Sequence, residues 1–132
     1  MDTPICNFST DNGLEIPELD LEGQAGFVDL PCNAWRSPGC KQMQTAATVH
    51  FYTHDRHFMN LVDNPGNALK AKAVNFVEIN FSLDETTPLA VGLYWIFQKR
   101  WIAAYWQEEG RQTFVDLHVP EKFQHHNLIG VP

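Results

Sequence analysis

The stretch 73–120 decides the fold, because it places two apolar segments on either side of a long helical pattern. The first segment reads Val74-Asn-Phe-Val-Glu-Ile-Asn-Phe-Ser82, and the second reads Thr113-Phe-Val-Asp-Leu-His-Val119. β-Branched and aromatic residues dominate both segments, which predicts two strands. Residues 89–109 between them are long enough for one helix, and two strands joined by a helix form a βαβ unit with parallel strands.

The predicted helix has a defined start and a defined end. Thr87 is a suitable N-cap, since its hydroxyl can accept a hydrogen bond from the first turn. Pro88 suits the first helical position, where its missing N–H would have no partner. Gly110 suits the left-handed conformation that commonly follows a helix. The sequence therefore predicts one uninterrupted helix between Thr87 and Gly110.

Most of the circumference of this helix is apolar, and only a narrow polar stripe remains around Gln98, Lys99 and Arg100. We expect Lys99 and Arg100 at the surface or its rim, and Trp95 and Trp106 in the core. A helix that is apolar on most sides is buried on more than one of them. Either the N-terminal part of the chain or a second copy of the protein therefore covers its outer face.

Upstream of this unit, 48–53 is rich in β-branched and aromatic residues and predicts another strand. A short helix capped by Asp55 is expected over 56–63, followed by one more helical turn over 67–72. Together these elements predict an α/β fold with a parallel sheet built from βαβ units, either open or forming part of a barrel.

The remaining residues, 1–47, contain half of the glycines and half of the prolines and predict an irregular arm that wraps around the core. The only short strand expected within the arm is 26–30. We therefore divide the chain into an arm, 1–47, and a βαβαβ core, 48–132, which is expected to be part of a longer domain.

Composition excludes several classes of protein. The chain has 132 residues, 44% of them hydrophobic, which is typical of one globular domain. Its net charge of −7, with only 9 lysines and arginines, disfavours nonspecific coating of a phosphate backbone. Cys6, Cys32 and Cys40 are too few for a disulfide framework. Residues 1–4 lack the basic start and apolar core of a secretory signal, and the charges in the long helix exclude a membrane span, so a cytoplasmic location is expected.

Polar side chains gather toward the carboxyl ends of the three predicted strands. Since alternate residues of a strand share a face, the polar residues fall into three groups. These are His50, Tyr52 and His54 on the first strand; Glu78, Asn80 and Ser82 on the second; and Asp116 and His118 on the third. Ligands of parallel α/β proteins bind at this end of the strands. The pattern predicts a shared pocket.

Two interpretations of this pocket remain open. In the functional one, Glu78, Asp116 and His118 carry acid–base chemistry or hold a divalent metal, because carboxylate and imidazole groups suit both tasks. His50, Tyr52, His54, Asn80 and Ser82 then bind a small or phosphorylated ligand. In the other interpretation, the same side chains form a satisfied hydrogen-bond network. In either case Glu78 and Asp116 need partners, since an unpaired buried carboxylate would be protonated; the nearest candidates are His118 and a histidine of the first strand.

Three segments together resemble one known family. They are Val49-His-Phe-Tyr-Thr-His-Asp; Val77-Glu-Ile-Asn-Phe-Ser followed by Pro88-Leu-Ala; and Arg100-Trp-Ile-Ala-Ala-Tyr-Trp-Gln followed by Phe114-Val-Asp-Leu. Over 48–132 the chain resembles the domain-of-unknown-function family 4417 (DUF4417) of bacteria, phages and plasmids. The resemblance implies a link to mobile elements and no established activity. It also implies that related chains continue past a sequence such as Gly130-Val131-Pro132, so this chain is expected to be a fragment.

Three functions are therefore open. The first is a ligand site at the strand ends, with or without a metal and with or without catalysis. The second is a nucleic-acid-associated role in phage or plasmid replication or maintenance, which would use a local basic patch of Arg36, Lys41, Lys99, Arg100 and Arg111. The third is a non-catalytic interaction module, which is favoured if a second copy of the chain covers the long helix.

Overall fold

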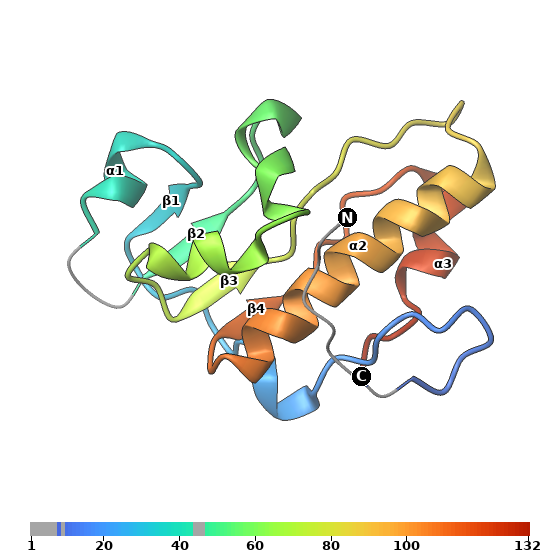
Figure 1. Ribbon diagram of the computed structural model, residues 1–132, viewed down its shortest axis with the longest axis horizontal. Coiled ribbons are helices and arrows are strands. Elements are labelled where there is room, and N and C mark those ends of the chain that lie inside the picture. The colour runs from blue at the N-terminus through green and yellow to red at the C-terminus, as the bar shows by residue number, and fades with distance from the viewer. Residues whose placement is uncertain (1–7, 9, 44–46) are drawn as a thin grey trace.

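In the computed structural model, four short strands form one parallel sheet in the order β1-β2-β3-β4 (Figure 1). The strands are β1 Cys32–Ala34, β2 Thr48–His50, β3 Asn75–Val77 and β4 Gln112–Phe114. The structure describes residues 8, 10–43 and 47–132. The prediction on disulfides that involves Cys6 and the prediction on a secretory signal at residues 1–4 concern residues outside these ranges. The α/β class and the parallel arrangement of the three predicted strands are confirmed.

The strand register gives the sheet one fully buried row. Val49 of β2 pairs with Phe76 of β3, which pairs with Thr113 of β4, and all three side chains are buried. The neighbouring row consists of Thr48, Asn75 and Gln112 and is polar. Because side chains alternate between the faces of a sheet, the first row faces the core and the second faces away from it.

The edge strand β1 was not predicted. The expected strand at 26–30 is wrong, and the strand lies instead at Cys32–Ala34, within the predicted arm. Its partner decides this position: Trp35 N donates to His50 O at 2.8 Å, and Thr48 N donates to Pro31 O at 3.0 Å. Three residues of weak strand propensity thus adopt extended structure because the edge of β2 offers them hydrogen bonds.

The segment before β1 crosses the amino-terminal end of the sheet. The Asn75 side-chain amide donates to Phe27 O at 3.2 Å and to Asp29 Oδ2 at 2.8 Å. At the other edge, Gln24 forms a parallel bridge with Thr113 of β4. This crossing occupies the amino end of the sheet and leaves the carboxyl ends of the strands for a site.

The long helix α2 spans Leu89–Glu108, and it begins one position later than predicted. Pro88 is the N-cap and provides no side-chain hydrogen bond, while the Thr87 hydroxyl accepts from Asp84 N at 3.0 Å. The expected cap by Thr87 is therefore wrong. At the other end Gly110 has φ +89°, the left-handed conformation expected there.

Both sides of α2 are covered by segments of this chain. Toward the sheet, the Trp106 ring lies 5.4 Å from Phe51 and 4.9 Å from Phe76. On the outer side, two residues of the N-terminal segment are buried against the helix: Ile16 in a cluster with Ile96, and Leu19 in another cluster. Of the two coverings expected for the helix, the N-terminal segment is the one observed.

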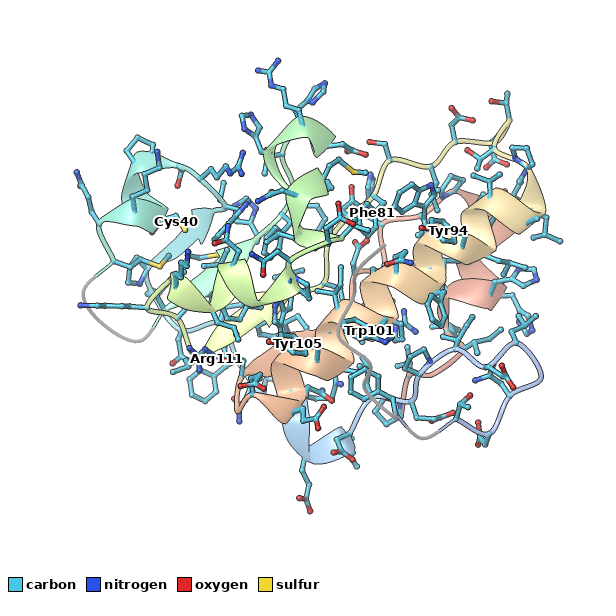
Figure 2. All side chains as sticks on the ribbon, in the orientation of Figure 1. Cys40, Phe81, Tyr94, Trp101, Tyr105 and Arg111 are labelled. Atoms are coloured by element: carbon cyan, nitrogen blue, oxygen red, sulfur yellow. The ribbon has the colours of Figure 1, made fainter. Side chains whose placement is uncertain are left out.

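Figure 2 labels the aromatic side chains Tyr94, Trp101 and Tyr105 along α2. The main difference from the prediction concerns the polar stripe of this helix. Gln98, Lys99 and Arg100 are all buried, with exposed fractions of 1%, 3% and 0%. The expectation that Lys99 and Arg100 lie at the surface is wrong. Trp106 is fully buried as expected, and Trp95 is partly buried.

The other helices are short. Within the described ranges these are α1 Pro38–Lys41, α3 Gln124–Asn127 and five 3₁₀ turns, namely η1 Leu21–Gly23, η2 Asp55–His57, η3 Met59–Leu61, η4 Pro65–Lys70 and η5 Glu121–Phe123. The helix expected over 56–63 is therefore two 3₁₀ turns, and His54 rather than Asp55 caps the first. Asp55 accepts from the backbone N–H and hydroxyl of Ser82 instead, at 3.0 and 2.7 Å.

Candidate functional site

The candidate site lies in the extended segments that follow β2, β3 and β4. Tyr52 comes two residues after the end of β2, Glu78 directly follows β3, and Asp116 comes two residues after the end of β4. Since the strands are parallel, these three segments leave the sheet at the same edge. Tyr52, Glu78 and Asp116 therefore lie past the carboxyl ends of their strands, the end of the sheet at which the sequence predicts a pocket.

Glu78 is fully buried and paired with the helix. Its Oε2 accepts from Arg100 Nε at 2.8 Å, and its Oε1 accepts from Arg100 Nη2 at 3.4 Å. The same Oε1 accepts from Asp116 N at 3.0 Å. Glu78 thus joins the central helix to the segment after β4.

Asp116 accepts four hydrogen bonds through its side chain. Oδ1 accepts from the Tyr52 hydroxyl and from His118 N, each at 3.0 Å. Oδ2 accepts from Asn80 Nδ2 at 3.0 Å and from Lys99 Nζ at 3.2 Å. Two carboxylate oxygens offer about four lone pairs, so this carboxylate is saturated.

The cations of the network are Lys99 and Arg100, consecutive residues of α2. Lys99 Nζ also donates to Asp116 O at 3.0 Å. Arg100 Nη1 donates to Ile129 O, and Nη2 donates to Asn127 O at 2.9 Å. With both carboxylates ionised, two positive and two negative charges cancel inside the protein. The expectation that histidines pair with Glu78 and Asp116 is wrong, because helix cations take that role.

Burial changes the acid–base behaviour of two members. Desolvation lowers the pKa of Lys99 from its ordinary value, although the Glu78 and Asp116 carboxylates oppose this change. Desolvation raises the pKa of Tyr52, and the negative charge of Asp116 raises it further. The Tyr52 hydroxyl therefore stays protonated and acts as a donor to Asp116.

A pH experiment tests this contact. Tyr52→Phe removes one hydrogen bond to a carboxylate and should lower the free energy of unfolding by about 1.5 kcal/mol at neutral pH. Since the folded-state pKa of Tyr52 lies above its unfolded value of 10.0, its contribution is complete below that pH and is lost as the pH rises further. Urea unfolding should show the stability of the wild type falling more steeply above pH 10 than that of Tyr52→Phe. Parallel pH profiles would contradict the contact.

The other predicted site residues lie at different places around this network. The His50 ring lies 5.8 Å from the Tyr52 ring, and its Nδ1 accepts from Tyr52 N at 3.3 Å; burial lowers its pKa. The His118 ring lies 6.4 Å from Tyr52 in an edge-on arrangement. His54 caps η2 by accepting from Arg56 N, so its side chain serves the local turn.

A hollow of about 300 Å³ opens beside the network. Its walls are formed by Asn80, Phe81, Ser82, Leu83, His118, Val119 and Pro120. Asn80, Ser82 and His118 of the predicted set thus reach the hollow. Asn80 Nδ2 donates both to Asp116 and to His118 O, the latter at 2.9 Å. The buried carboxylate therefore fixes the position of a wall residue.

The structure gives the metal prediction no support. Within 8, 10–43 and 47–132, no three histidine, cysteine, aspartate or glutamate side chains are arranged to hold a metal ion. Glu78 and Asp116 are already occupied by donors from Lys99, Arg100 and their neighbours. A metal would have to displace these donors, and the cations beside it would oppose its charge.

The basic patch predicted for nucleic acid is also wrong as a unit. Lys99 and Arg100 are buried among carboxylates, and Arg111 donates to Leu69 O at 3.2 Å. Of the five predicted residues only Arg36 and Lys41 lie together, beside a second hollow on another part of the protein.

The sequence interpretation missed Lys99, Arg100 and Asn127 as members of the site. Asn127 Nδ2 donates to Asp116 O at 2.9 Å from the far end of the chain. The sequence did contain a signal for Lys99 and Arg100. They are adjacent positive residues in a helix that is apolar on nearly all sides, so this helix has little polar surface on which they could lie. Nothing local to Asn127 indicates its role.

Together, the parallel sheet, the helix cations and the strand-end hollow define an α/β domain with a buried ion network beside its candidate site. The family described as "Domain of unknown function (DUF4417)" matches residues 8–130, and the chain belongs to this family. No helix in the part of the chain that the structure describes is long and apolar enough to cross a membrane.

Two curated phage proteins are similar to this chain. It is 30% identical over 107 residues to the "Gene 1 protein" of Mycobacterium phage L5 and 27% identical over 107 residues to the "Gene 1 protein" of Mycobacterium phage D29. Each match covers 78% of this chain, but only 45% and 38% of the two phage proteins. The chain thus spans less than half the length of these relatives. No solved structure matches it.

Proposed function

We propose that this phage-related domain binds a small, uncharged, hydroxyl-bearing ligand in the hollow at the carboxyl ends of β3 and β4. The observation that carries the proposal is the buried network of Glu78, Asp116, Lys99 and Arg100, which holds wall residues of the hollow in place. Replacing a buried ion pair by apolar residues is often neutral or stabilising. A four-charge network is therefore better explained by positioning than by stability.

The walls of the hollow determine the ligand class. Asn80, Ser82 and His118 offer amide, hydroxyl and imidazole groups, while Phe81 and Val119 offer apolar contact. None of the described residues that line it is a lysine, an arginine or a carboxylate. A volume of about 300 Å³ is at the small end of the range for ligand pockets. These features favour a molecule such as a monosaccharide or a nucleoside over a highly charged one.

The polar groups of the hollow suit ligand binding, and we assign no chemical reaction to them. Asn80 Nδ2 is occupied by Asp116 and His118 O, which leaves its Oδ1 to accept from a ligand hydroxyl. Ser82 Oγ donates to Asp55 Oδ1 and can still accept a hydrogen bond. Such preorganised groups, supported by a buried layer behind them, are the usual requirement for a specific small-molecule site.

Nuclear magnetic resonance titration with a panel of nucleosides and monosaccharides tests the proposal. We expect at least one compound, at millimolar concentration, to shift the Asn80 side-chain amide and the His118 resonances in a saturable way. His118→Ala should weaken this binding at least tenfold. His125→Ala, which removes an exposed histidine of α3, is the matched control and should leave it unchanged. Shifts that map elsewhere, or no saturable shift with any compound, would reject the proposal.

A further inference from the structure

A second hollow, with a volume of about 390 Å³, lies at the end of the molecule that carries α1, which Figure 1 shows at the opposite end from α3. It is lined by Trp35, Arg36, Cys40, Lys41, Met43, Lys70, Ala71 and Lys72. One wall comes from α1 and the turn before it, and the other comes from the end of η4. Figure 2 labels Cys40 in this region, well separated from Tyr94 on α2.

The charge of this hollow is opposite to that of the whole protein. The chain carries 9 lysines and arginines against 16 aspartates and glutamates, yet Arg36, Lys41, Lys70 and Lys72 all line this one hollow. Among the residues that the structure describes, no carboxylate lines the hollow, and none forms a salt bridge with any of the four cations. Four like charges around one cavity repel one another, so an anion bound there would relieve this repulsion.

The local backbone brings these cations to the rim. Arg36 has φ +64°, a left-handed conformation that non-glycine residues seldom adopt, and it directly precedes the cap of α1. Ser37 Oγ accepts from Cys40 N at 3.1 Å and fixes the turn that carries Lys41. Strained residues gather at functional sites, which makes Arg36 a marker of this hollow.

Part of the lining of the hollow is aromatic or apolar. Trp35 is half-buried, and its ring lies 5.8 Å from Phe51 of the core. Its indole Nε1 is buried and has no hydrogen-bond partner among the described residues. Cys40 and Met43 are buried beside it. An aromatic face and a thioether suit a nucleobase, while lysine and arginine at the rim suit a phosphate group.

We propose that this hollow binds a nucleoside phosphate, with the base against Trp35 and the phosphate among Arg36, Lys41, Lys70 and Lys72. The same chemistry is presented by a free nucleotide and by one nucleotide unit of a single strand of nucleic acid. This site is separate from the strand-end hollow and does not depend on the function proposed for it.

Titration of the whole chain with AMP, adenosine, inorganic phosphate and a single-stranded oligothymidylate tests the inference. We expect AMP to bind at least tenfold more tightly than adenosine or phosphate, to shift the Trp35 indole N–H resonance, and to weaken as salt is raised. The double variant Lys70→Gln/Lys72→Gln should reduce the affinity at least tenfold. The charge-matched control Arg56→Gln/Lys122→Gln alters two exposed cations outside the hollow and should retain the wild-type affinity for AMP.

Each other outcome of the titration either supports or overturns the proposed nucleoside-phosphate site. Tighter binding of the oligonucleotide than of AMP would assign the site to nucleic acid, and equal or weaker binding would assign it to free nucleotides; both support the proposal. Phosphate that binds as tightly as AMP would overturn the role of the base. Absence of binding, or equal losses in the two double variants, would overturn the site. Thermal unfolding of both variants at the wild-type temperature confirms that they are folded.

Discussion

Arg100→Met should lower the free energy of unfolding by about 3–5 kcal/mol, because it leaves the Glu78 carboxylate buried without its ion-pair partner. Glu78 and Arg100 are both fully buried, and Arg100 Nε lies 2.8 Å from Glu78 Oε2. The change also removes the hydrogen bonds to Asn127 O and Ile129 O. Urea unfolding at neutral pH measures the loss.

A double variant separates the ion pair from simple packing. In Glu78→Gln/Arg100→Met neither charge remains, so the double variant should be less destabilised than the sum of the two single changes by at least about 1 kcal/mol. Arg56→Met replaces an exposed arginine and should change stability by no more than about 0.5 kcal/mol. Strict additivity of the two buried substitutions would show that the pair is not coupled.

Trp106→Ala should cost about 3–5 kcal/mol, because it opens a large cavity between α2 and the sheet. The side chain is fully buried, stacks on Phe51, packs at a tilt against Phe76, and donates from Nε1 to Pro65 O at 3.1 Å. Trp106→Phe keeps most of the aromatic contact and should cost less. Chemical denaturation measures the loss. If the free energy of unfolding depends on denaturant concentration with the same slope in the wild type and in Trp106→Ala, the loss arises in the folded core.

The control for this experiment is Leu21→Ala, since Leu21 is 72% exposed and lies on the N-terminal segment. It should change the free energy of unfolding by less than about 0.5 kcal/mol. If Trp106→Ala costs less than about 1 kcal/mol, the tryptophan contributes little to the core, and the packing of α2 on the sheet would need another explanation.

The main elements of the fold could be predicted from the sequence. Val74-Asn-Phe-Val and Thr113-Phe-Val carry strand propensity that does not depend on distant partners, and Gly110 provides the left-handed residue that ends α2. The position of Glu78 and Asp116 at one end of the sheet was also predictable, because parallel strands leave their sheet in the same direction.

Where the sequence reasoning failed, the missing information lay far along the chain. β1 is extended because β2 offers hydrogen bonds to three residues that have little strand propensity of their own. His54 caps η2 in place of Asp55, and Ser82, 27 residues after Asp55, supplies donors to the Asp55 carboxylate.

By itself, the sequence determined the class of the fold, the central helix and the end of the sheet where polar groups gather. Only the tertiary structure decided that Lys99 and Arg100 are buried and that Arg36, Lys41, Lys70 and Lys72 surround one hollow. The physical reason is that periodicity and propensity act over a few residues. The position of a charge depends instead on which opposite charges, dipoles and solvent surround it after the chain has packed.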